Sequence, residues 1–187
     1  MRAFWRGGYH ATPVSKLSAA TGMRPGALYQ TFGDKQGLLL AALARYRELG
    51  VGRVRSLLPG QPSPIEGIRQ YLLDQVEMSQ AGDGDGRGCL ACNSALELLP
   101  GDPAIAEAVG GIFRDLHGCI AEAVVAGQRQ GEIDDRVPAG DVATGLLALV
   151  EGMLVLGRVC DDAERMRAVV ELTIESLRAV PSPGAVR

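Results

Sequence analysis

The sequence predicts an all-α protein with two parts. Apolar residues recur at helical spacing along most of the chain, and no segment alternates convincingly as a strand would. Alanine, leucine, valine and glycine dominate, and only 4% of the 187 residues are aromatic, which suits closely packed helices better than a β-sandwich. Proline and glycine divide the chain into segments of helical length. We therefore expect a small N-terminal helical domain followed by a larger helical domain.

Two short helices joined by a tight turn are expected over residues 12–32. Thr12 is placed to cap the first helix, Pro13 fits its first position, and Gly22 can adopt the left-handed conformation that ends it. Pro25 opens the second helix, which carries Leu28 and Phe32 inward at i,i+4 spacing. This pattern is typical of a helix-turn-helix, whose second helix enters the major groove of DNA.

The other expected helices follow from caps, breaks and apolar stripes. Residues 1–7 read as the end of a helix whose start is missing, which indicates either a start assigned too late or a truncated protein. A helix over 35–58 ends at Pro59-Gly60-Gln61-Pro62, and Ser63-Pro64-Ile65-Glu66 forms a capping box for the next helix. After a flexible loop over 81–88, helices are expected at 89–99, 102–131, 138–159 and 162–179.

The segment from Phe4 to Leu43 resembles the DNA-binding domain of the tetracycline-repressor (TetR/AcrR) family of bacterial transcription regulators. The resemblance rests on matches at fixed spacing: Phe4, Gly8-Tyr9, Thr12, Val14, Ala19-Ala20-Thr21-Gly22, Gly26, Leu28-Tyr29, Phe32, Lys35 and Leu38-Leu39. They cover about a quarter of the chain, and residues 88–97 resemble a stretch found in one branch of the family. The resemblance implies a helix-turn-helix DNA-binding domain at 1–47, an effector-binding and dimerisation domain at 48–180, and a tail at 181–187, which we expect to be disordered.

The charge is distributed unevenly along the chain. Residues 1–55 hold nine Lys and Arg against two Asp and Glu, a net charge of +7, whereas the remaining ten basic and twenty acidic residues give −10. A basic head on an acidic body is expected of a DNA-binding regulator. The alternative is a chance fluctuation in surface charge.

The residues expected at DNA lie in and around the second short helix: Thr12, Arg24, Pro25, Gly26, Ala27, Tyr29, Gln30 and Lys35. In the family this helix supplies base contacts and a tyrosine on the phosphate backbone, which the resemblance assigns to Tyr29. Gln30 suits adenine or phosphate, and Ala27 suits a thymine methyl. Arg24 departs from the family pattern, which has a small capping residue there, and suits phosphate or guanine. The competing interpretation makes Tyr29 a half-buried helix residue.

Two further phosphate contacts are expected beside this helix. Lys35 opens the 35–58 helix, and its ammonium group and the positive end of that helix would together hold one phosphate. Thr12 would bind another through its side chain or N–H group, a role compatible with capping.

Cys89 and Cys92 form a Cys-x-x-Cys pair at the expected start of a helix. A helix N-terminus lowers a thiol pKa, so a thiol-based redox sensor or oxidoreductase is the first alternative function. The chain lacks the βαβ context of thioredoxin-like enzymes, and we favour burial as small hydrophobic side chains. No metal site is expected, because His10 and His117 offer no second pair at zinc-ligand spacing.

Four residues are candidates for contact with a small-molecule effector: Phe113, His117, Glu151 and Met153. Phe113 and His117 lie one turn apart on the long helix, although a lone histidine is more often structural. Glu151 interrupts an apolar helix. Facing inward it could recognise a ligand amine or hydroxyl, and the alternatives are that it faces solvent or pairs with an arginine.

The sequence thus predicts a DNA-binding regulator in the cytoplasm, by default a ligand-responsive repressor, without catalytic activity or a cofactor. No signal peptide is visible, and the longest apolar stretch, 142–157, falls short of a membrane span. The resemblance implies a homodimer on a palindromic double-stranded operator, joined by the last two helices in a four-helix bundle. The second alternative is a helical interaction module that has lost DNA binding through its shortened first helix.

Overall fold

The computed structural model describes residues 1–80, 87–159 and 162–179, and within these ranges it is all-α, as expected. Outside the helices, the backbones of Ile133 and Arg178 form an isolated antiparallel β-bridge. The described helices are α1 (Arg2–Gly7), α2 (Val14–Thr21), α3 (Pro25–Phe32), α4 (Lys35–Leu57), α5 (Pro64–Gln80), α6 (Leu90–Leu98), α7 (Pro103–Arg129), α8 (Ala139–Leu156) and α9 (Ala163–Leu177). Most of the expected 81–88 loop and the whole 181–187 tail lie outside the described residues.

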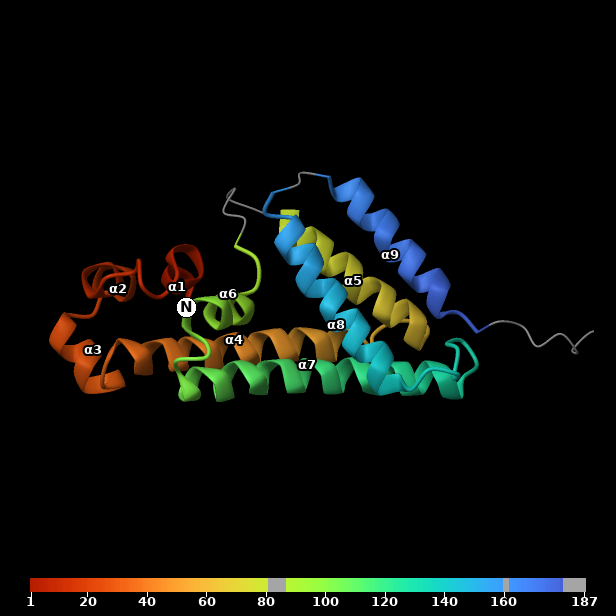
Figure 1. Ribbon diagram of the computed structural model, residues 1–187, viewed down its shortest axis with the longest axis horizontal. Coiled ribbons are helices and arrows are strands. Elements are labelled where there is room, and N and C mark those ends of the chain that lie inside the picture. Colours follow the sequence, from red (N-terminus) through yellow and green to blue (C-terminus); the bar gives the residue numbers. More distant parts are fainter. Residues whose placement is uncertain (81–86, 160–161, 180–187) are drawn as a thin grey trace, which may run out of the picture.

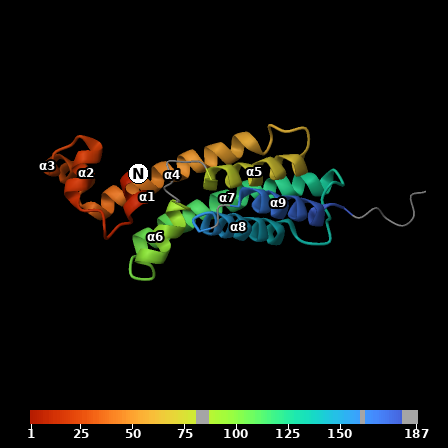
Figure 2. The same cartoon turned by 90° about the horizontal axis from the view of Figure 1, so that it is seen from above.

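The molecule is elongated along α4 and α7, which lie side by side (Figure 1). The first three helices form a head at one end, and α5, α8 and α9 cover the other end, an arrangement that is also visible from above (Figure 2). Helix α4 contacts α3 in the head and α5 and α7 in the body. The domain boundary expected at residue 47 falls inside α4, which is continuous from one part to the other, and it stays a prediction.

The head is built around inward-facing side chains from its short helices. Phe4, Leu17 and Leu28 are buried, so each helix contributes an apolar side to one small core. Gly22 adopts the expected left-handed conformation with φ 71°. Pro25 occupies the first position of α3, as predicted.

Thr12 does not cap α2, contrary to expectation. The N-cap position is Pro13, and it makes no side-chain capping bond. Thr12 is fully buried, and its hydroxyl donates to the Gly8 carbonyl at 2.7 Å. The buried hydroxyl needs an internal acceptor, and the carbonyl at the end of α1 supplies one.

Acidic residues begin several helices, and one cap comes from a distant part of the chain. Asp34, Asp102 and Asp162 accept backbone N–H groups at the starts of α4, α7 and α9. At the start of α5, the Ile65 N–H donates to the Glu132 carboxylate at 3.2 Å. The sequence predicts a local capping box for the first N–H groups of α5. A carboxylate from the segment after α7 instead satisfies one of these groups.

Ion pairs join α4 to the body. Arg53 pairs with Asp74 of α5, and Arg47 with Asp115 of α7. These arginines account for part of the basic excess in residues 1–55. The sequence therefore overstates the number of cations available to DNA, because carboxylates of α5 and α7 neutralise these two.

Helix α8 is the one described helix that is long and apolar enough to cross a membrane. That criterion uses only length and composition, and helices buried in a protein core also meet it. Here α8 packs against α5 and α7.

Candidate DNA-binding surface and regulatory cavity

Helix α3 lies at the tip of the head (Figure 1). It turns a surface of polar and small residues to solvent. Leu28 faces inward, whereas Tyr29 is 46% exposed. Arg24, Pro25, Gly26 and Gln30 are exposed, and Ala27 is half-buried. The structure thus brings together on one short helix six of the eight residues expected at DNA.

Gly26 leaves the backbone of α3 accessible on this surface. A Cβ built at Gly26 would meet no protein atom within 4 Å, and its backbone has an ordinary helical conformation rather than a positive φ. Glycine in a helix costs about 0.5–1 kcal/mol relative to alanine, and nothing within the chain requires it here. The missing side chain leaves room for another molecule to approach the backbone of α3.

Lys35 lies beside α3 and is held by an aromatic ring. Its Nζ lies 4.6 Å from the centroid of the Tyr9 ring, a distance suited to a cation–π interaction. Asp34 caps α4 by accepting the Gly37 N–H at 2.7 Å, so the positive end of the helix already faces a carboxylate. The predicted phosphate site therefore depends on Lys35 more than on the helix end.

Thr12 is buried and is therefore not part of this surface. Its hydroxyl donates to Gly8, and its N–H donates to the Tyr9 carbonyl at 3.3 Å. Neither group is free to bind a phosphate, so we correct its assignment from DNA contact to packing of α1 against α2.

A carboxylate of α6 holds the loop after α1, a contact that the sequence did not predict. Glu97 accepts the N–H groups of Tyr9 at 2.7 Å and His10 at 2.6 Å. A Cβ at Gly8, where φ is +73°, would lie 2.9 Å from a Glu97 carboxylate oxygen. Nothing in the local sequence signals a partner almost ninety positions away.

A cavity of about 310 Å³ lies where α4, α5, α7 and α8 meet near the start of α6. Trp5, Tyr46 and Tyr71 contribute aromatic walls, and the Trp5 and Tyr46 rings pack edge to face at 5.2 Å. Glu151 alone of the four predicted effector residues lines this cavity. It faces inward and is half-buried, and its Oε2 atom has no hydrogen-bond partner within the described part of the chain.

The other three predicted effector residues lie elsewhere. His117 binds the Gly140 carbonyl at 3.0 Å and so joins α7 to α8. Ile112 and Leu116, each one position earlier than a predicted residue, line the cavity in place of Phe113 and His117. Met153 is buried in the core and, two positions after Glu151, lies about 200° around the helix.

The Cys89 thiol begins α6 and is buried beside the cavity. It accepts the Tyr46 hydroxyl at 3.5 Å and the Cys92 N–H at 3.4 Å. Burial and the nearby Glu151 carboxylate raise the pKa of Cys89 to about 12, and burial also raises the pKa of Cys92. Burial therefore outweighs the thiol-activating effect of the helix end, which supports neutral thiols, buried at Cys89 and half-buried at Cys92, over a redox pair.

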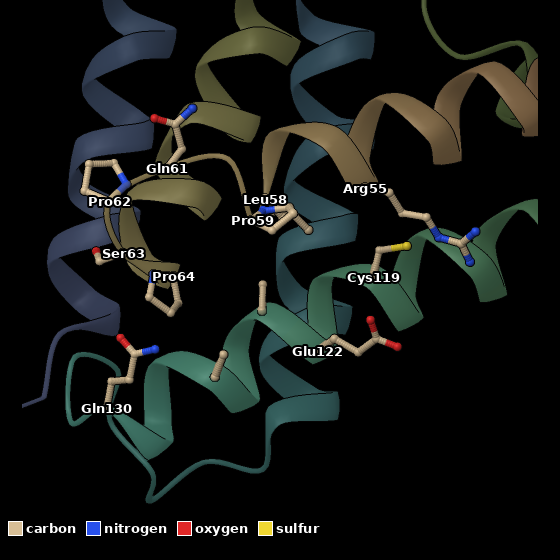
Figure 3. Close-up of a pocket in the computed structure, with 12 residues that line it drawn as sticks. Arg55, Leu58, Pro59, Gln61, Pro62, Ser63, Pro64, Cys119, Glu122 and Gln130 are labelled. Carbon is tan, nitrogen blue, oxygen red and sulfur yellow. The ribbon is translucent and has the colours of Figure 1, made fainter.

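A second pocket of about 420 Å³ lies between the segment after α4 and helix α7 (Figure 3). Pro59, Pro62 and Pro64 line one side, and Cys119 and Glu122 line the other. None of the sequence-predicted site residues lies in it. Among the described residues, no group of three or more His, Cys, Asp or Glu side chains is arranged to hold a metal ion.

Two family models match most of the chain. "Bacterial regulatory proteins, tetR family" matches residues 1–42, and "Tetracyclin repressor-like, C-terminal domain" matches residues 64–173. The HTH-type transcriptional repressor ComR of Escherichia coli (strain K12) is 24% identical, over 93% of this chain and 83% of its own. The uncharacterized HTH-type transcriptional regulator YezE of Bacillus subtilis (strain 168) is also 24% identical, over 95% of this chain and 91% of its own.

Solved structures share the whole arrangement of helices. A cysteine-substituted form of the TetR family transcriptional regulator CifR, complexed with 26-bp double-strand operator DNA, is 28% identical. It aligns with a TM-score of 0.82 over 94% of this chain and 91% of its own. A TetR family regulator from Agrobacterium tumefaciens, 22% identical with a TM-score of 0.83 over 95% of this chain and 92% of its own, shows the same fold.

Proposed function

The chain belongs to the tetR family of bacterial regulatory proteins and is a DNA-binding transcription regulator, and we propose that it is a ligand-responsive repressor. The observation that carries the proposed DNA contacts is the surface of α3, where Gly26 is open and Tyr29 and Gln30 are exposed. CifR, which shares this fold, is complexed with operator DNA, and that similarity supports binding of an operator by this chain. In this proposal the protein acts by binding and not by catalysis, in the bacterial cytoplasm where the DNA lies.

We propose a homodimer on a palindromic double-stranded operator. Two recognition helices enter successive major grooves when they lie about 34–36 Å apart. Exposed apolar side chains on the last two helices supply a surface for the partner: Val155, Leu156, Val169 and Leu172. Burying them against a second copy would remove apolar area from water, at about 25 cal/mol for each Å².

The ligand response is proposed to pass through α6. The start of this helix, at Cys89, lines the cavity, and its Glu97 holds the loop of the head. A ligand that favours a different position of α6 would select dimers with a different spacing of the two heads. Operator affinity would then fall by the ratio of ligand affinities for the two states.

Gly26→Ala tests the DNA-binding surface, because it separates stability from function. Alanine fits the open space, so the variant should be as stable as the unchanged protein or more stable, by up to about 1 kcal/mol. Its methyl group would obstruct close approach, so affinity for an operator selected from genomic DNA should fall at least tenfold. Gly52→Ala is the matched control, because a Cβ there also meets no protein atom within 4 Å but lies far along α4, and it should leave operator affinity unchanged.

Lys35→Ala adds a test based on salt dependence. Loss of one phosphate contact should weaken binding and reduce the slope of log affinity against log salt by about one unit. Unchanged affinity in Gly26→Ala together with an unchanged slope in Lys35→Ala would refute the proposed surface.

A further inference from the structure

Glu151 presents an uncompensated acidic group to the cavity. Its Oε2 atom is buried without a hydrogen-bond partner, and no ion pair to it occurs among the described residues. Burial raises the pKa of Glu151, and the neighbouring Cys89 and Cys92 thiols, which are weak donors, oppose that rise. The carboxyl group therefore lacks a strong donor among the described residues.

The arginines of the cavity do not supply that donor. Arg47 and Arg53 line the cavity, but their guanidinium groups pair with Asp115 and Asp74. Their charges are compensated by carboxylates of α7 and α5. The Gln75 amide, the Cys89 thiol and Met1 also line the cavity, and among the described residues Glu151 is its one lining carboxylate.

We propose that the cavity binds a small organic cation, an amine attached to an aromatic or aliphatic body, with its ammonium group on Glu151. This inference rests on the proposed function, in which the cavity is the effector site, and it names the chemical class of the effector. The rings of Tyr46 and Tyr71 line the same space, and aromatic faces attract cations. Trp5 also lines it, and the Arg87 guanidinium already lies 5.5 Å from the centroid of the Trp5 ring. The volume of about 310 Å³ lies at the lower end of ligand pockets and suits a body of one or two rings.

The cavity should distinguish ligands that share one hydrophobic body but carry different polar end groups. An ammonium offers several donors and a positive charge, and a charge-assisted hydrogen bond is about twice as strong as a neutral one. An alcohol supplies a single neutral donor. A carboxylate places a second negative charge beside Glu151 and supplies no donor, so it should bind weakest.

Trp5 provides a direct measurement of binding, because it is the single tryptophan of the chain and lines the cavity. We would titrate the full chain with 4-phenylbutylamine, 4-phenylbutanol and 4-phenylbutyrate, which share one body, and follow tryptophan fluorescence. The amine should bind at least tenfold more tightly than the alcohol, and butyrate more weakly still. Failure of the amine to bind at millimolar concentration, or equal binding of the three probes, would overturn the proposal.

Two variants assign the preference to one side chain. In Glu151→Gln the preference for the amine over the alcohol should fall at least tenfold, with affinity for the alcohol nearly unchanged. Glu122→Gln, in the second pocket (Figure 3), is the matched control and should keep the full preference. Thermal unfolding of both variants checks that each one folds, and retention of the preference in a folded Glu151→Gln would refute the assignment.

Operator binding is measured separately, on the unliganded protein. Loss of the amine preference with intact operator binding would refute the ligand class and leave the proposed regulator standing. Absence of operator binding with an intact, Glu151-dependent amine preference would instead refute the proposed function.

Discussion

Glu97 is expected to contribute more to stability than an ordinary surface carboxylate. It accepts two backbone N–H groups, from Tyr9 at 2.7 Å and from His10 at 2.6 Å. Hydrogen bonds to charged groups contribute about 1.5–3 kcal/mol each, and the bond to His10 is discounted because it is exposed. Glu97→Ala should therefore reduce the free energy of unfolding by about 2–4 kcal/mol, a large part of the 5–15 kcal/mol typical of a domain.

The loss should be concentrated where the head meets the body. Urea unfolding at fixed protein concentration measures the change in free energy, and hydrogen exchange measures local opening at Tyr9 and His10. Exchange of these two amides should accelerate in Glu97→Ala by more than exchange in the core of α7. Glu107→Gln is the control, because Glu107 pairs with Arg114 in a largely exposed ion pair, which contributes at most about 1 kcal/mol.

The reasoning fails if Glu97→Ala loses no more stability than Glu107→Gln. It also fails if protection of the Tyr9 and His10 amides is unchanged, since the two hydrogen bonds would then not hold the loop in solution.

Two further predictions concern the dimer and the thiols. Leu172, 71% exposed on α9, should lie in the dimer interface, so Leu172→Glu should sediment as a monomer at micromolar concentration. The control Leu96→Glu, at a site 79% exposed on α6, should remain a dimer. A dimeric Leu172→Glu would place the interface elsewhere. The Cys89 thiol, with a pKa raised to about 12 by burial, is about one part in ten thousand thiolate at pH 8, so labelling by a disulfide reagent should be slow there and accelerate as pH rises. Peroxide should leave operator binding unchanged, and release from DNA that is lost in the Cys89→Ser, Cys92→Ser double variant would refute the buried-thiol interpretation.

Local signals in the sequence determined the helices and the type of protein. Gly22 ends α2 and Pro25 begins α3 as expected, because a left-handed glycine and a fixed proline φ are properties of single residues. Asp102 begins α7 because a side-chain oxygen reaches N–H groups two and three residues ahead. The resemblance of the first forty residues to the tetR family is confirmed by the family models.

Only the tertiary structure decided which groups meet across the fold. Periodicity places Phe113 and His117 on one side of a helix, but packing turns Ile112 and Leu116 toward the cavity, because a one-residue change rotates the side chain by about 100°. The sequence allowed three environments for Glu151, and burial beside aromatic rings without a counter-ion selected the inward-facing one. The contact of Glu97 with the loop after α1 depends on how α6 packs against α1, which no local pattern specifies, because long-range contacts are set by the shapes of whole packed surfaces.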